Sequence, residues 1–113
     1  MTTVNAGAPA SFAAQVAHDE GARTCVRLIG ELDVAVAPRA AEAIAQAERS
    51  RPATLELDLS SLAFMDSTGL RLLLSARQRA LEAGRRLLLR RGPDAVQRVF
   101  EVTALAPLFE FVD

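Results

Sequence analysis

The chain has 113 residues, half of them hydrophobic, which is enough for one domain with one packed core. Its formal charge is −1 and it has no Trp or Tyr, so it lacks the basic surface and stacking side chains typical of nucleic-acid-binding proteins. All 13 basic residues are Arg, which excludes lysine chemistry, and a single Cys and a single His argue against a zinc site. We expect no direct nucleic-acid binding, no metal and no cofactor.

The cysteine content and the N-terminal segment indicate a cytoplasmic protein. One cysteine permits no internal disulfide, as is usual in the reducing cytosol. Residues 1–10 lack the basic start and apolar run of a signal peptide, and no apolar stretch approaches the roughly 20 residues that span a membrane. We predict a flexible tail over 1–10 and a single domain over 11–113.

The first half of the domain is predicted to contain two strands and a helix. The strands cover 12–17 and 24–29, are joined by a polar hairpin loop, and the second ends at Gly30. The helix covers about 38–50, because Pro38 suits the first helical position and apolar residues recur at helical spacing. Its inner face is expected to carry Ala40, Ile44 and Ala47.

The second half alternates strands with helices. Strands are predicted over 54–59, 86–90 and 108–112, and helices over 67–83 and 94–103. The core stripe of the long helix is expected to be Leu70, Leu73, Leu74 and Leu81, and Gly84 is expected to end that helix. The order ββαβαβαβ predicts an α/β fold in which a mixed, mostly parallel sheet packs against helices.

The segment Asp66-Ser67-Thr68-Gly69 is the strongest candidate for a functional loop. It follows a strand and opens a helix, the place where open α/β sheets usually carry their functional residues. Local chemistry permits two interpretations of Ser67: a helix N-cap, or a hydroxyl that carries a phosphate at the helix start. Gly69 is unfavourable in the first turn of a helix. Its presence there would be explained either by a partner that approaches the backbone closely or by close packing inside the fold.

Three other sites have structural interpretations that we favour. Asp58 at a strand end is reminiscent of a response-regulator receiver, but the lysine of such a domain is absent, so we expect Asp58 to accept backbone N–H bonds. Cys25 lies in a largely apolar run and is predicted to be an inert core thiol. Glu31 and Asp33 are predicted to be solvated loop acids rather than an acid–base pair.

Several segments resemble the STAS domain of anti-sigma factor antagonists. The specific one is Phe-Met-Asp-Ser-Thr-Gly-Leu at 64–70. Supporting segments lie at 30–33, 37–38, 57–59 and 96–103, so that the resemblance covers roughly 12–112. It implies an α/β sandwich and a binding switch rather than an enzyme.

The resemblance also implies partners and a modification. The unphosphorylated form would bind an anti-sigma factor that is also a serine kinase and holds the nucleotide, and so free a sigma factor. The kinase would phosphorylate Ser67, with Thr68 as the secondary candidate, and a PP2C-type phosphatase would reverse the reaction. The expected partner surface consists of Asp33, Asp66, Thr68, Gly69, Leu70, Arg71, Ser75 and Gln78.

An alternative role and two departures from the family pattern accompany the resemblance. The alternative is an accessory STAS subunit of a lipid or anion transport system, which would bind constitutively and use Ser67 only as a cap. Ala104 stands where the family commonly has Gly, at a cost of about 1 kcal/mol if the residue is left-handed. The chain stops at Asp113, where many relatives add a final helix that covers one flank of the sheet.

Overall fold

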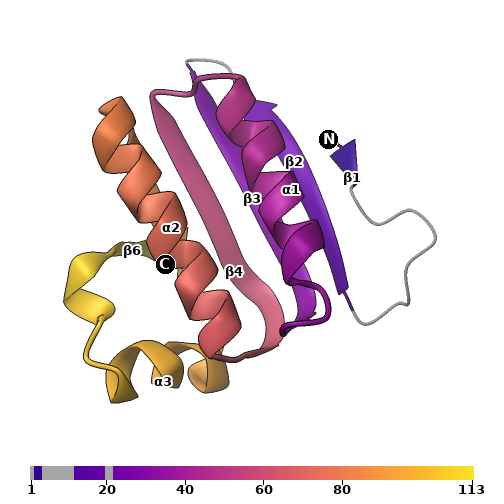
Figure 1. Cartoon of the computed structure of the whole chain (residues 1–113), viewed down its shortest axis with the longest axis vertical. Helices are drawn as coiled ribbons and strands as arrows, with labels where there is room; N and C mark the ends of the chain where they lie inside the picture. The colour runs from indigo at the N-terminus through magenta and orange to yellow at the C-terminus, as the bar shows by residue number, and fades with distance from the viewer. Residues whose placement is uncertain (1, 4–11, 20–21) are drawn as a thin grey trace.

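The fold is a six-stranded sheet whose strands lie side by side in sequence order (Figure 1). The computed structural model describes residues 2–3, 12–19 and 22–113. The strands are β1 (Thr2–Thr3), β2 (Phe12–Asp19), β3 (Arg23–Leu32), β4 (Thr54–Met65), β5 (Arg86–Arg90) and β6 (Glu110–Val112). The first three strands pair antiparallel and β3 to β6 pair parallel, which confirms the predicted mixed sheet.

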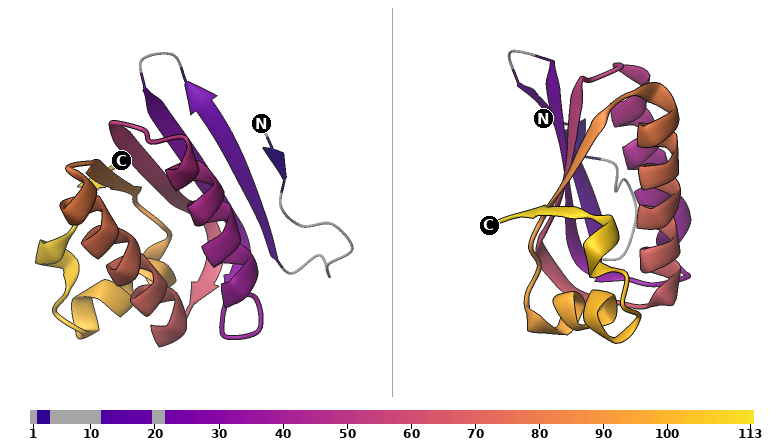
Figure 2. Two further views of the ribbon diagram at one scale, coloured as in Figure 1. Left: turned by 45° about the horizontal axis from the view of Figure 1, so that its top comes forward. Right: turned by 90° about the vertical axis from the view of Figure 1, so that its left-hand side faces the viewer.

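Two long helices cover one face of this sheet. Helices α1 (Ala37–Arg49) and α2 (Ser67–Ala83) connect neighbouring parallel strands and lie together on one side of the sheet (Figure 2, right). Crossovers of one hand that advance in one direction leave their helices on the same face. The shorter helix α3 (Asp94–Val102) lies at the end of the sheet where α2 begins (Figure 1), and a 3-10 turn (Ala106–Leu108) precedes β6.

The core lies between the sheet and the two long helices. Alternate residues of β4 point into it, as predicted, and are fully buried: Leu55, Leu57 and Leu59. The predicted inner face of α1 is also fully buried: Ala40, Ile44 and Ala47.

The buried face of α2 agrees with the prediction at Leu70 and Leu73 but is rotated from it further along the helix. Leu81 was expected in the core but is 61% exposed. The buried stripe is centred on small residues, which let the helix approach the sheet closely, and consists of Gly69, Leu70, Leu73, Ala76 and Ala80. A pattern counted on leucines alone therefore placed the stripe too far around the helix.

Three strands run further than the sequence predicted: β2 continues by two residues to Asp19, and β3 and β4 extend further still. Gly30 does not end β3: with φ 98° it lies in an irregular stretch where the pairing with β4 shifts register, and the strand continues to Leu32. The expected loop after residue 59 is likewise part of β4, because pairing with β3 extends to Leu32 opposite Met65. This long pairing brings the start of α2 beside the turn that precedes α1.

Two further predictions concern the N-terminal segment and membrane spans. Thr2–Thr3 forms β1 beside β2 where a flexible tail was expected, and the rest of 1–10 lies outside the described residues. Among the described residues, no helix is both long and apolar enough to cross a membrane.

Candidate functional site

Asp66, and not Ser67, is the N-cap of α2. Its backbone is extended, and its Oδ1 accepts the N–H of Thr68 at 2.9 Å and of Gly69 at 3.3 Å. A carboxylate in this position satisfies two N–H groups that lack a partner inside the helix. The cap interpretation of Ser67 is therefore wrong. Ser67 is the first residue of the helix, exposed, and its hydroxyl makes no hydrogen bond with the described residues.

Gly69 is required by packing inside the fold. A Cβ at this position would lie 2.5 Å from Cγ of Met65 and 3.0 Å from Cδ2 of Leu32. Leu70 beside it is 4% exposed. Both residues were expected on the partner surface, but their burial leaves them shaping the loop from beneath rather than offering side chains to a partner.

Asp33 organises the turn before α1. Its Oδ1 accepts the N–H of Ala35 at 3.0 Å and of Val36 at 3.3 Å, and its carbonyl accepts the N–H of Ala37 at 3.0 Å. Val34 at the tip of this turn is 72% exposed. The carboxylate thus holds an apolar side chain out toward solvent near the start of α2.

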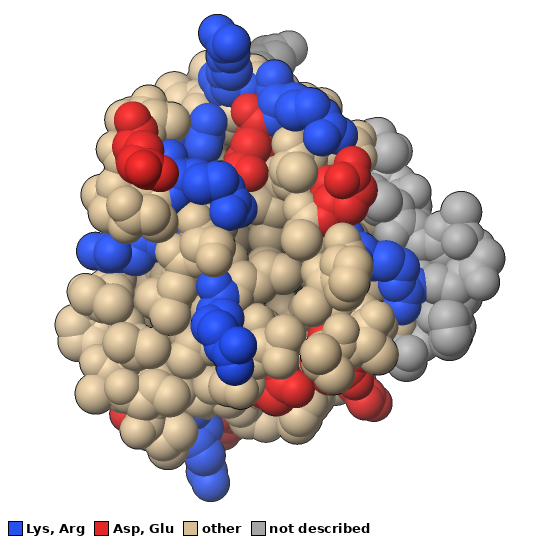
Figure 3. Space-filling model, viewed as in Figure 1, with Lys and Arg blue, Asp and Glu red and all other residues tan. Residues whose placement is uncertain are grey.

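A groove of about 530 Å³ runs between α1 and α2. Its lining consists of Val34, Ala37, Pro38, Ala41, Thr68, Arg71, Leu72, Ser75 and Arg79. The molecular surface between the two helices is mostly uncharged (Figure 3). Three residues predicted for the partner surface, Thr68, Arg71 and Ser75, come together here, whereas Gln78 is exposed but does not line the groove.

The α1 side of the groove was missed from the sequence. An exposed valine in a turn, followed by small residues on the outer face of a helix, is a weak pattern that becomes a groove only when α2 packs alongside. The cations of the groove differ in pairing: Arg79 forms an ion pair with Glu48 at 2.9 Å, while Arg71 is exposed and forms no ion pair with the described residues.

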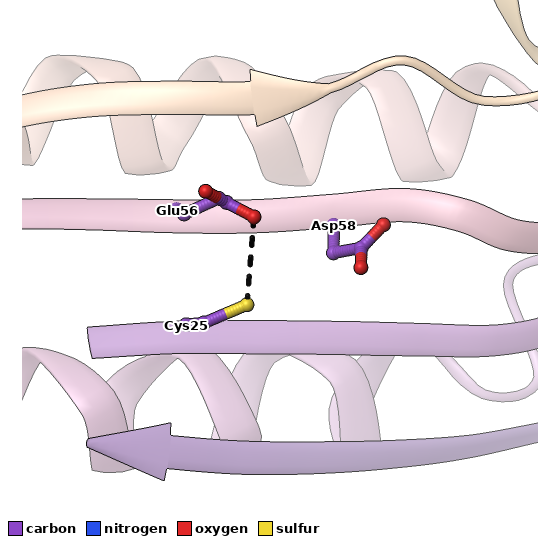
Figure 4. Close-up of side chains that lie close together, drawn as sticks. All are labelled: Cys25, Glu56 and Asp58. Atoms are coloured by element: carbon purple, nitrogen blue, oxygen red, sulfur yellow. Dashed lines mark hydrogen bonds between the residues drawn. The ribbon is translucent and has the colours of Figure 1, made fainter. Parts of the chain in front are cut away.

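The helix-free face of the sheet carries a separate polar cluster of Cys25, Glu56 and Asp58 (Figure 4). Glu56 pairs with Arg23 and, at 3.0 Å, with Arg90. Asp58 pairs with Arg27 at 3.4 Å and accepts the Ser60 N–H at 2.9 Å, as expected of a carboxylate that organises backbone. Burial opposes ionisation of both acids, but these bonds outweigh it and hold the pKa of each carboxyl below its usual range.

Cys25 lies on this polar face and not in the apolar core, which corrects the expectation drawn from its neighbours. Its Sγ is 3.7 Å from Oε2 of Glu56. Burial and the nearby Glu56 charge raise the pKa of the thiol to about 12, so it stays protonated and a poor nucleophile. The three ligand atoms lie within 4.8 Å of one another, but guanidinium groups already neutralise both carboxylates, which favours an ion-pair network over a bound cation.

The family follows from the comparison with known proteins. Residues 13–113 match the model of the STAS domain, and the chain belongs to this family. It is 32% identical over 81 residues to the anti-sigma-B factor antagonists of Listeria monocytogenes and Listeria innocua, covering 72% of this chain and 71% of theirs.

Solved structures of anti-sigma factor antagonists are also similar to this chain. An anti-sigma factor antagonist from Mycobacterium paratuberculosis superposes with a TM-score of 0.76 at 30% identity, covering 92% of this chain and 87% of that one. The anti-sigma factor antagonist SpoIIAA in its unphosphorylated form gives 0.71 at 29% identity, covering 88% of each chain. SLC26A9 gives 0.63 at 18% identity, over 84% of this chain and 19% of that one, which shows a shared fold alone.

Proposed function

We propose that this protein is an anti-sigma factor antagonist controlled by phosphorylation of Ser67. The unphosphorylated form binds an anti-sigma factor that is also a serine kinase, and this binding releases a sigma factor in the cytoplasm. Phosphorylation ends the binding, and a PP2C-type phosphatase restores it. The protein itself acts by binding, and the nucleotide belongs to the kinase. The names of the Listeria, mycobacterial and SpoIIAA relatives support this role.

The observation that carries the proposal is the free hydroxyl of Ser67. Because the Asp66 carboxylate caps the helix, the Ser67 hydroxyl is exposed and makes no hydrogen bond within the described structure. A kinase can therefore reach it without unfolding the helix start. Thr68 is half-buried at the edge of the groove, which makes it the weaker acceptor.

A phosphate at this position suits a switch that changes binding but not the fold. It adds about −1.5 to −2 charges at an exposed residue next to the Asp66 carboxylate. The fold tolerates this charge in water, but a partner that covers the helix start must desolvate it. A loss of about 4 kcal/mol of binding free energy weakens affinity roughly a thousandfold.

The test of the acceptor is phosphorylation by the cognate anti-sigma factor with ATP. Wild type is expected to gain one phosphate at Ser67, located by mass spectrometry of the digested protein. Ser67→Ala should gain none, and the matched variant Thr68→Ala should gain it as the wild type does. Phosphate incorporation by Ser67→Ala at the wild-type rate contradicts the assignment.

The test of the switch is binding of phosphomimetic variants. Ser67→Asp is expected to fold normally and to lose binding to the anti-sigma factor, while Ser67→Asn, of the same size without the charge, keeps most of it. Calorimetric titration and a thermal melt measure both properties. Undiminished binding of Ser67→Asp contradicts the switch and agrees instead with a constitutive STAS subunit.

A further inference from the structure

The start of α2 offers few free donors to a phosphate on Ser67. The N–H groups of Thr68 and Gly69 already bond to the Asp66 carboxylate, and the Leu70 N–H bonds to the Asp66 carbonyl at 3.2 Å. A helix start usually receives a phosphate through such N–H groups. Here the cap occupies them, so a phosphate on Ser67 stays hydrated, pairs with another group, or displaces Asp66.

Arg71 is placed to be that partner. It lies four residues after Ser67 on α2, and residues at this spacing are neighbours on one face of a helix. Its side chain is exposed and forms no ion pair with the described residues. The neighbouring Asp66 and Asp33 are acidic, and Arg79, the other arginine of the groove, lies twelve residues after Ser67 on α2 and is paired with Glu48.

We propose that Arg71 couples the phosphorylation of Ser67 to partner release. In the unphosphorylated protein its guanidinium is free to bind a carboxylate of the anti-sigma factor. In the phosphorylated protein it pairs with the phosphate on its own helix. Phosphorylation thus adds a negative charge that repels an acidic partner, and it also occupies the Arg71 guanidinium that would attract that partner. The biological meaning of this coupling rests on the proposed function above.

The groove specifies the kind of segment that binds. Its lining is largely apolar, and of its two arginines Arg71 is the one that forms no ion pair within the described part of the chain. A partner segment that fits combines apolar side chains over Pro38 and Leu72 with an acidic side chain at Arg71. Charge complementarity of this kind determines specificity and the rate of association.

The pairing of Arg71 with the phosphate is tested without any partner. The full chain is produced with phosphoserine at position 67 by genetic code expansion. The pH titration of the phosphate is then followed by ³¹P NMR at low salt. Its second pKa is ordinarily about 6. We expect Arg71→Gln to raise this midpoint by about 0.3 pH units, the size expected of an exposed ion pair one helical turn apart.

Arg49→Gln is the control, since it removes the same charge from an exposed residue in the last turn of α1, at the other end of the helix layer. It should leave the midpoint where the wild type has it. A midpoint in Arg71→Gln equal to that of Arg49→Gln overturns the proposal.

The contact with the partner is tested on unphosphorylated protein and purified anti-sigma factor. Arg71→Gln is expected to weaken binding about tenfold and to reduce its salt dependence, Arg71→Lys to retain most of it, and Arg49→Gln to leave it unchanged. Wild-type affinity in Arg71→Gln overturns the role of Arg71 even if Ser67→Asp abolishes binding. Failure of the wild type to bind contradicts the proposed function instead, and the phosphate titration still decides whether Arg71 pairs with the phosphate.

Discussion

At the scale of single residues, Asp66 and Ser67 differ in what they do at the start of α2. Asp66 satisfies the helix donors, and Ser67 is left exposed with an unengaged hydroxyl. A serine that capped the helix would have to change its cap hydrogen bonds on modification, so phosphorylation would act on the helix as well as on binding. The proposed phosphorylation of Ser67 would leave the Asp66 cap in place.

This difference predicts unequal effects of truncating the two residues. Asp66→Ala should lower the free energy of unfolding by about 1 kcal/mol because it removes the cap, and Asp66→Asn should recover most of the loss. Ser67→Ala should change it by less than about 0.5 kcal/mol, as is usual for an exposed residue. Urea unfolding measures all three, and an equal cost for Ser67→Ala would show that the hydroxyl shares in capping.

The sequence could not assign the cap among Asp66, Ser67 and Thr68, because all three residue types cap helices well. The assignment depends on which residue has the extended backbone, here Asp66 with φ −105° and ψ −169°. That backbone follows from the pairing of Met65 with Leu32, a contact between segments 33 residues apart.

At the scale of elements, α2 and α3 end in the same way with different residues. Gly84 (φ 67°) and Ala104 (φ 59°) are both left-handed. The following residues close the same type of hydrogen bond, from Arg85 N–H to the Ala80 carbonyl and from Leu105 N–H to the Phe100 carbonyl. The departure from the family pattern at Ala104 is therefore a strained helix end and not a different ending.

The two helix ends predict substitutions of opposite sign. Ala104→Gly should stabilise the protein by about 1 kcal/mol by relieving the left-handed strain. Gly84→Ala should destabilise it by a similar amount, although its Cβ would meet nothing within 4 Å, because the cost lies in the backbone. Thermal or urea unfolding measures both, and a destabilised Ala104→Gly would contradict this account.

The helices were easier to predict than the strand ends. Helix α2 has the predicted bounds because its cap and its terminal glycine are local features of the sequence. The long ends of β3 and β4 depend on each other's backbone, and the exposure of Leu81 depends on how closely small residues let α2 approach the sheet.

At the scale of the whole molecule, the two faces of the sheet have different chemistry. The face under α1 and α2 is apolar and supports the groove, while the opposite face carries acids paired with arginines across β3, β4 and β5. Glu56 and Asp58 are each 4% exposed, which is tolerable only because hydrogen-bonded partners accompany the charges.

This network predicts acid sensitivity. The pKa of Glu56 is lowered in the folded state, so its contribution to stability is complete above the unfolded-state pKa of about 4.3 and is lost as the pH falls through the folded value. The free energy of unfolding should therefore fall between about pH 5 and pH 2. Glu56→Gln should be less stable at pH 7 and show a shallower fall.

The control for this prediction is Glu42→Gln, an exposed acid on α1 paired with Arg49. Exposed ion pairs contribute little, so this variant should follow the wild-type profile. Urea unfolding at a series of pH values measures the slope, and an unchanged slope in Glu56→Gln would contradict the stabilising role of the network.

The sequence by itself determined the order of elements from β2 onward, the bounds of α2, the end of α2 at Gly84 and the Asp-Ser-Thr-Gly segment typical of the family, because each depends on residues close together in the chain. Only the tertiary structure decided that Asp66 is the cap and that Gly69 and Leu70 lie beneath the surface. It also decided that Cys25 faces carboxylates and that Val34 and Arg71 line one groove. These depend on which strands pair and how closely α1 and α2 pack, and such contacts join residues far apart in sequence.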